Sequence, residues 1–266
     1  MSLRALSDYL VRPMAPPEQA TLEAIEGGPI DSRQALALES VDRLLDPVPL
    51  ERETGWCVLG DGVAYVAVRT AMPGVSGEMV DWWFDWHARD SLRYRIWHPR
   101  AHLENSLRPP SVVGAKAHWG AVHHPVEDVG TGLVHARIEF KAPTEMGMRG
   151  DALEDSDVAS IVCGYAGDDR LRVRHSPMFH VFLREGEGEG EGVVLRSRFW
   201  LGAALRPYGP LGALAEPLLN TPFVRRRALP NHLPSGLARH CAEEYANLGA
   251  LLPELYERFG PGATPA

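Results

Sequence analysis

The order of hydrophobic and polar residues divides the chain into a proline-punctuated beginning and a longer body. In the first 50 residues, "PPEQATLEAIEGG" and "DSRQALALESVDRLL" place apolar residues at helical spacing. A Gly-Gly stop ends the first segment, and an Asp cap begins the second. The stretch "DPVPLERETG" then has the composition of a linker. We therefore expect a helical N-terminal extension over residues 1–50 and a main domain over residues 51–266.

Short runs rich in β-branched and aromatic residues fill the main domain and predict strands between Gly, Pro and Asp turns. These runs are "AYVAVRTAM", "GLVHARIEFKAP", "DVASIVCGYAG", "RLRVRHSPMFHVFLRE" and "GVVLRSRFWLG". The alternating stretch "EGEGEGEG", from Glu185 to Gly192, cannot build a packed strand and predicts a flexible hairpin connection. The segment "GEMVDWWFDWHARDS" has helical spacing instead.

A long amphipathic helix is predicted from Leu237 to Phe259, with Pro253 as a bend or a break. Its apolar positions form one stripe that we expect to face the sheet, namely Leu237, Cys241, Tyr245, Leu248, Leu252 and Leu255. Several antiparallel strands followed by one long helix indicate an α+β domain in which a curved sheet wraps that helix.

Composition and charge narrow the classes of partner. Of the 266 residues, 45% are hydrophobic and 23% charged, which is ordinary for a globular protein with a sizeable core. The formal net charge of −8 argues against nucleic acid or an anionic membrane as partner. Three widely spaced cysteines form no disulfide framework, and the N-terminus lacks the apolar run of a signal peptide. We therefore expect a cytoplasmic protein that binds neither nucleic acid nor a membrane.

Candidate chemistry begins with the helical stretch "LARHCAEEYANL". His240 and Glu244 stand four residues apart, so both side chains leave the same face of the helix. A surface His–Glu pair is the simpler interpretation of this motif, because two ligands alone do not make a metal site. Six of the eleven histidines, however, lie between His87 and His124. One histidine and one carboxylate from that region would complete a set of four ligands suited to Zn²⁺, with Mn²⁺ or Fe²⁺ as rivals.

The combination of motifs resembles the 2,4-diacetylphloroglucinol hydrolase family, whose relatives include phloretin hydrolase. The resemblance rests on "RHCAEEYANL", on "DWWFDWH", on the spacing of Tyr94, His102 and Asn105, and on the strands around "FHVFLRE" and "GVVLRSRFWLG". It covers roughly residues 55–260. The resemblance implies a Bet v 1-like helix-grip domain, which agrees with the sheet-and-helix order, and a zinc-dependent homodimer.

The resemblance also implies roles for individual residues. Zn²⁺ ligands fall on His102, His240 and Glu244, with Glu127 as the second carboxylate and Glu139 as its alternative. Tyr94 and Asn105 match substrate-binding positions, and His180 matches the catalytic histidine. A second substrate-binding tyrosine of the family has no clear counterpart, since "LRSRFWLG" offers Phe199 and Trp200, with Tyr208 the nearest tyrosine.

The activity that the resemblance implies is hydrolysis of the carbon–carbon bond between an acyl group and a polyhydroxylated aromatic ring. Water would attack the acyl carbonyl after the ring takes its keto form, in a retro-Claisen reaction that releases a carboxylic acid. Two alternatives stay open, because a helix-grip fold by itself does not specify chemistry. One is a non-catalytic carrier of an aromatic polyketide, and the other is a metal-free cyclase.

Overall fold

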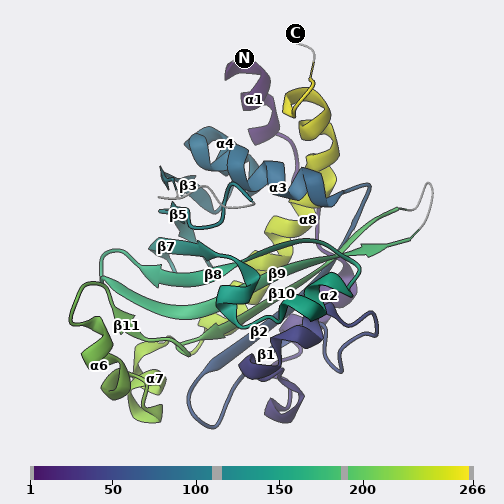
Figure 1. Ribbon diagram of the computed structural model, residues 1–266. Coiled ribbons are helices and arrows are strands. Elements are labelled where there is room, and N and C mark those ends of the chain that lie inside the picture. The colour runs from purple at the N-terminus through teal and green to yellow at the C-terminus, as the bar shows by residue number, and fades with distance from the viewer. Residues whose placement is uncertain (1–2, 110–115, 187–190, 264–266) are drawn as a thin grey trace.

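A curved antiparallel sheet wraps around a long C-terminal helix in the computed structural model of the protein (Figure 1). The structure describes residues 3–109, 116–186 and 191–263. The main path of the sheet runs β1-β2-β10-β9-β8-β7-β5-β4, while β11 pairs with β9, and β6 pairs with β3 and β7. The strands are β1 (Gly55–Val58), β2 (Ala64–Pro73), β3 (His102–Glu104), β4 (Leu107–Arg108), β5 (Val122–His123), β6 (Val126–Asp128), β7 (Leu133–Lys141), β8 (Val158–Asp168), β9 (Val173–Glu185), β10 (Gly192–Leu201) and β11 (Arg206–Pro207).

The helices lie mainly at the two ends of the chain and in the connection from β2 to β3. They are α1 (Leu3–Leu10), α2 (Gln19–Glu26), α3 (Gly77–Trp86), α4 (Ser91–Trp97), α5 (Gly150–Glu154), α6 (Gly212–Leu219), α7 (Pro222–Ala228) and α8 (Leu233–Phe259). The 3₁₀ segments in the described part of the chain are η1 (Ser32–Gln34), η2 (Leu38–Leu45), η3 (His87–Arg89) and η4 (Pro143–Met146). This architecture confirms the predicted α+β, Bet v 1-like helix-grip fold.

Most of the predicted elements are present. The five predicted strands correspond to β2, β7, β8, β9 and β10, and the tryptophan-rich segment forms α3, whose first turn is capped by the Ser76 side chain. Helix α8 begins four residues earlier than predicted and continues through Pro253. The Glu-Gly connection falls in part on residues 187–190, which lie outside the described residues, although Gly192 pairs with Glu185 at the ends of β10 and β9.

The helix predicted over residues 31–45 is wrong in type. The Asp31 side chain does cap the segment by accepting from the Arg33 backbone, but two 3₁₀ segments form instead of one α-helix. Ala35 and Ala37 are extended, which breaks the helix between these segments. The Leu36 carbonyl accepts a hydrogen bond of 2.8 Å from the Trp200 indole of β10. Tertiary contacts therefore override the local helical pattern here.

Strand β10 separates two hydrophobic cores, because alternate residues of a strand face opposite sides of the sheet. Leu195, Phe199 and Leu201 face the core that contains α8. Val194 and Trp200 face a second core, which is covered by η2 and the residues around it. The predicted stripe of α8 packs in the first core, with five of its six side chains buried and Leu237 partly buried. A cavity lies on this α8 side of the sheet.

The first helices also pack against α8. The Tyr9 hydroxyl donates to Glu254 at 2.7 Å, and Arg12 forms an ion pair with the same carboxylate at 2.6 Å. The Ala15 backbone N–H donates to the Asn247 side chain at 3.1 Å. The domain boundary near residue 50 stays a prediction. Among the described residues, no helix combines the length and the apolar character that spanning a membrane requires.

Candidate metal centre and cavity

The metal-binding residues predicted from the sequence come from three elements that meet at one point. Strand β3 carries His102, β6 carries Glu127, and these two residues are direct partners in the β3–β6 pairing. Helix α8 carries His240 and Glu244 one turn apart. The turn after β6 approaches α8 so closely that a Cβ on Gly130 would lie 2.9 Å from the Gly236 Cα, and Gly130 has a φ of +85°. Glycine at both positions permits this contact.

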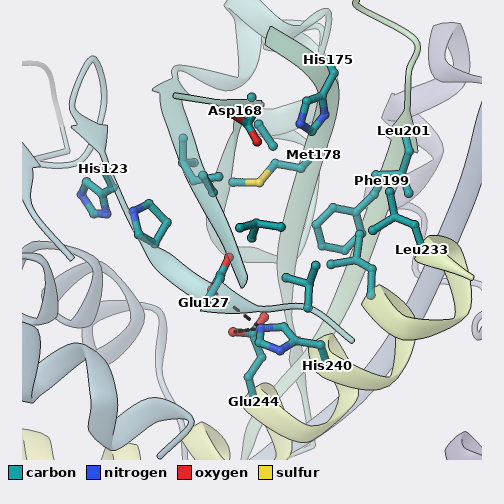
Figure 2. A pocket seen from close by; sticks show the side chains of 18 of the residues that line it. His123, Glu127, Asp168, His175, Met178, Phe199, Leu201, Leu233, His240 and Glu244 are labelled. Carbon is teal, nitrogen blue, oxygen red and sulfur yellow. Dashed lines mark ion pairs between the residues drawn. The ribbon is translucent and has the colours of Figure 1, made fainter. Parts of the chain in front are cut away.

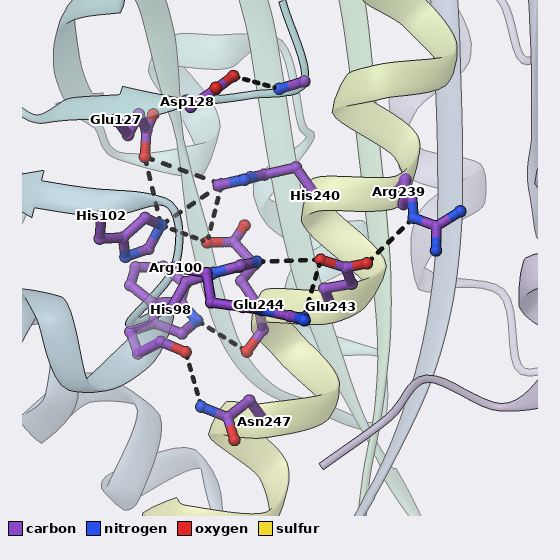
Figure 3. Close-up of polar contacts among 12 residues, drawn as sticks. His98, Arg100, His102, Glu127, Asp128, Arg239, His240, Glu243, Glu244 and Asn247 are labelled. Carbon is purple, nitrogen blue, oxygen red and sulfur yellow. Dashed lines mark hydrogen bonds and ion pairs between the residues drawn. The ribbon is translucent and has the colours of Figure 1, made fainter. Parts of the chain in front are cut away.

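The four side chains converge on one another (Figure 3). The His102 Nε2 and His240 Nε2 atoms are 3.4 Å apart. Glu127 Oε2 lies 3.3 Å from the His102 nitrogen and 3.8 Å from the His240 nitrogen. Glu244 Oε2 lies 3.5 Å and 3.7 Å from the same two nitrogens. His102, Glu127 and His240 have ligand atoms that all lie within 4.8 Å of one another.

These spacings cover five of the six pairs among the four ligand atoms and are close to those that a tetrahedral ion requires. Ligand distances of roughly 2.0–2.2 Å to Zn²⁺ place neighbouring ligand atoms about 3.3–3.6 Å apart. The observed contacts of 3.3–3.8 Å fall at or just above this range. The donor set of two imidazoles and two carboxylates also suits Zn²⁺. The residues present therefore fit a divalent metal ion of this kind.

The protonation of the cluster also suits a metal. Burial lowers the pKa of His102 well below its ordinary value, and it lowers the pKa of His240 to about 3. Both imidazoles are therefore neutral near pH 7, which is the form that ligates metals. The pKa of Glu127 and that of Glu244 are raised, first by burial, and for Glu244 also by repulsion from Glu127. A cation between the carboxylates would relieve that repulsion.

Contacts outside the four side chains fix their orientation. The His102 Nδ1–H donates to the Tyr94 carbonyl at 3.2 Å, which leaves Nε2 as the nitrogen turned toward the cluster. The rings of Tyr94 and His102 stack with centroids 4.1 Å apart, and the Tyr94 hydroxyl donates to Glu127. Helix α4 is anchored to α8 by the Trp97 indole, which donates to the Glu244 carbonyl at 3.0 Å.

The two carboxylates that were alternatives in the sequence have different surroundings. Glu127 lies within the cluster, as described above. Glu139, on β7, instead accepts a hydrogen bond of 2.8 Å from Arg137. It does not line the cavity next to the cluster, although its neighbours Ile138 and Phe140 do. The geometry thus favours Glu127 over Glu139.

A cavity of about 380 Å³ opens beside the cluster, between the sheet and α8. Figure 2 shows Glu127, His240 and Glu244 at one end and Asp168 and His175 at the other, with Met178 and Phe199 between them. Most of the remaining wall is apolar, formed by Val134, Ile138, Phe140, Ala166, Leu201, Leu229, Leu233 and Leu237. An apolar pocket with few polar groups is typical of a site for a small organic molecule.

The predicted catalytic and substrate-binding residues all line this cavity. His180 projects from β9, its Nδ1 lies 2.8 Å from the Ser197 hydroxyl, and burial lowers its pKa to about 3. Tyr94 lines the wall beside the metal cluster. Asn105 is also in the wall, and its buried side-chain oxygen has no hydrogen-bond partner among the described residues.

Strand β10, which follows the strand that carries His180, places the apolar aromatic side chain of Phe199 in the cavity wall. Phe199 faces the cavity, 5.4 Å from the His180 ring, while Trp200 faces the opposite core. Tyr208 does not line the cavity; its ring lies under Arg137, with 4.4 Å between the guanidinium carbon and the ring centroid. Neither Phe199, which has no hydroxyl, nor Tyr208, which lies outside the wall, therefore supplies a phenol hydroxyl to a ligand in this cavity.

Three other histidines of the histidine-rich region have contacts that differ from one another. His98 is buried and bonds Glu243 at 3.2 Å, and its ring stacks on His240. His123 and His124 face opposite sides, as adjacent strand residues must: His123 lines the cavity and His124 contacts Asp169.

Several polar residues of the cavity wall were not predicted from the sequence as part of it, namely His87, His123, Asp168, His175 and Tyr245. His87 and His123 belong to the histidine-rich region, so clustering was a usable signal. Tyr245 had been assigned to the apolar stripe, from which nothing distinguished it.

Comparison with known proteins finds relatives that match most of the chain. The chain is 32% identical to phloretin hydrolase of Eubacterium ramulus over 257 residues, covering 93% of this chain and 88% of the relative. It is 31% identical to 2,4-diacetylphloroglucinol hydrolase of a Pseudomonas species over 258 residues, covering 93% of this chain and 85% of the relative. Among solved structures, the Zhui aromatase/cyclase of a Streptomyces species aligns with 13% identity and a TM-score of 0.38, over 76% of this chain and 99% of that one. The sequence model described as "DAPG hydrolase PhiG domain" matches residues 36–257, and the chain therefore belongs to that family.

Proposed function

We propose that the protein hydrolyses the carbon–carbon bond between an acyl group and a polyhydroxylated aromatic ring, with a divalent metal ion held by His102, Glu127, His240 and Glu244. The observation that carries this proposal is the convergence of two imidazoles and two carboxylates at one end of an otherwise apolar cavity. Relatives named for phloretin and for 2,4-diacetylphloroglucinol support it. Both compounds attach their acyl group to the ring through carbon, so hydrolysis must break that bond.

The metal would supply a Lewis acid and a bound water of lowered pKa beside the acyl carbonyl. The protein's own residues would position the ring. The unpartnered side-chain oxygen of Asn105 can accept a hydrogen bond from a ring hydroxyl. The Tyr94 hydroxyl, held by Glu127, lies where it can meet a second ring oxygen. The apolar wall would exclude bulk water from the reacting carbon.

His180 would move the proton. Its low pKa keeps the imidazole neutral, so it can take a proton from a ring hydroxyl oxygen and return it to the acylated ring carbon. The ring is then a ketone, and addition of water to the acyl carbon breaks the carbon–carbon bond. The electron pair of that bond stays with the ring as an enolate, a far better leaving group than an aryl carbanion. The products are the deacylated phenol and a carboxylic acid.

Metal content and acid release, measured together, test the proposal. Wild-type protein should contain about one zinc per chain and release acid from monoacetylphloroglucinol. His102→Ala and His240→Ala should lose both, whereas His180→Asn should keep the zinc and lose about 10²- to 10⁴-fold in kcat. Alanine variants that retain stoichiometric zinc would contradict the ligand assignment. Binding of the phenol without metal or cleavage would identify a carrier instead. Cytoplasmic location and a homodimer stay predictions.

A further inference from the structure

Tyr245 holds a buried hydroxyl that none of the described residues satisfies. Helix α8 places it directly after Glu244, and its side chain is fully buried. The hydroxyl has no hydrogen-bond partner among the described residues, although Tyr245 is part of the cavity wall. Leaving a buried hydroxyl unpaired costs free energy, so such a group calls for a functional explanation.

The position of Tyr245 relates this hydroxyl to the reacting groups. Its ring centroid is 5.0 Å from that of His180 and 5.3 Å from that of Trp97. It also directly follows Glu244 along α8. Tyr245 is therefore a neighbour both of the proposed proton-transferring histidine and of a proposed metal-binding carboxylate.

The other aromatic neighbour of His180 cannot offer a hydrogen bond. Phe199 lies 5.4 Å from the His180 ring and carries no polar atom. Of these two rings, Tyr245 alone can donate to a ligand that sits against His180. A phenol hydroxyl can donate a hydrogen bond, and the Tyr245 hydroxyl has no acceptor among the described residues.

We propose that the Tyr245 hydroxyl donates a hydrogen bond to the substrate's ring oxygen ortho to the acyl group. This inference rests on the proposed function, because it assumes a phenolic ligand in the cavity. The ortho oxygen is chosen because Tyr245 neighbours His180, which would deliver the proton to the acylated ring carbon, and the ortho oxygen is on the next carbon of the ring. As negative charge develops on the ring during cleavage, the hydrogen bond strengthens and stabilises the enolate. Tyr245 keeps its proton throughout and forms no covalent bond.

The test is Tyr245→Phe, which removes only the hydroxyl oxygen. With monoacetylphloroglucinol as substrate, kcat/KM should fall about 10- to 100-fold, the effect of leaving one substrate oxygen unpaired. Zinc content and the thermal midpoint should stay at the wild-type values or rise slightly, because no hydrogen bond within the described residues is lost. A lowered midpoint with unchanged kinetics would indicate a packing role and overturn the proposal.

Tyr208→Phe is the matched control. It removes another buried hydroxyl that has no partner among the described residues, and Tyr208 lies outside the cavity wall. Its kinetics should equal those of the wild type. A loss in kcat/KM as large as that of Tyr245→Phe would show a general effect of removing such hydroxyls and would contradict the assigned contact.

A binding measurement separates this inference from the proposed function. Equilibrium dialysis with phloretin, carried out in chelator so that the proposed hydrolysis does not consume the ligand, should show weaker binding to Tyr245→Phe than to the wild type. The difference should vanish for an acetophenone that lacks both ortho hydroxyls. If the wild type binds phloretin in this Tyr245-dependent way but cleaves nothing, the hydrolase function fails and the contact stands. If the wild type cleaves and Tyr245→Phe matches it in binding and rate, the contact fails alone. If the wild type neither binds nor cleaves, both fail.

Discussion

Replacement of Glu244 by glutamine should change stability in opposite directions with and without metal. The carboxylate is 7% exposed, and burial together with the charge of Glu127 raises its pKa. In metal-free protein at neutral pH, the structure therefore carries a charge that burial disfavours, or must bind a proton to remove it. Glutamine has nearly the same shape and no charge, so Glu244→Gln relieves that cost.

The magnitude follows from the burial. Relieving one unfavourable buried polar or charged group is worth about 1–3 kcal/mol. For a chain of this size, roughly 2–4 °C of thermal midpoint corresponds to each kcal/mol. The midpoint of metal-free Glu244→Gln should therefore rise by about 2–12 °C. With zinc, the sign reverses, since a ligand is lost and each tenfold loss of affinity removes about 1.4 kcal/mol of stabilisation.

The neighbouring residue provides a matched control. Glu243 accepts hydrogen bonds from His98 at 3.2 Å and from Arg239 at 3.0 Å, which hold its pKa at about 2 (Figure 3). Glu243→Gln should thus lower the midpoint with or without metal. Differential scanning fluorimetry of both variants, in chelator and in excess zinc, measures all four values. If Glu244→Gln lowers the midpoint in chelator as Glu243→Gln does, the Glu244 carboxylate is satisfied by the protein alone and the reasoning is refuted.

Two further predictions concern the rest of the fold. Glu53→Gln should lower the free energy of unfolding in urea by about 3–5 kcal/mol, because it leaves two buried guanidinium groups without a counter-charge. These are the fully buried Arg198 and the nearly buried Arg196, at 2.8 and 3.0 Å from Glu53. Glu51→Gln, at an exposed site, should change it little, and equal losses for the two variants would contradict this account. Burial lowers the pKa of His118 to about 4, so below about pH 6.5 the unfolded chain binds a proton that the folded protein does not bind. The free energy of unfolding should therefore fall by about 2 kcal/mol through this residue when the pH is lowered from 7 to 5. Urea titrations of the wild type and His118→Gln at both pH values test this, and equal losses in the two proteins would contradict it.

Local patterns determined much of this protein. The period of apolar residues predicted α8, its buried face and the strands that it packs against, because side-chain direction in a helix or strand repeats within a few residues. The same geometry stacks His240 and Glu244 one turn apart whatever else the chain does. Where long-range contacts compete with local preference the prediction was wrong, as in residues 31–45, whose backbone follows the partners of Leu36 and Leu44 on β10.

Only the tertiary structure shows which side chains from other elements lie next to His240 and Glu244 of α8. His102 and Glu127 meet because β3 and β6 pair in one register with an irregularity between His102 and Glu104, and a slip of one residue would turn the side chains to the other face. No local pattern specifies such a register, so Glu127 and Glu139 were alternatives in the sequence. The same holds for Tyr245: the apolar stripe predicts its burial, but only the packed cavity shows that its hydroxyl has no partner among the described residues. Hydrogen bonding of a buried group depends on atoms from distant segments, which sequence periodicity does not encode.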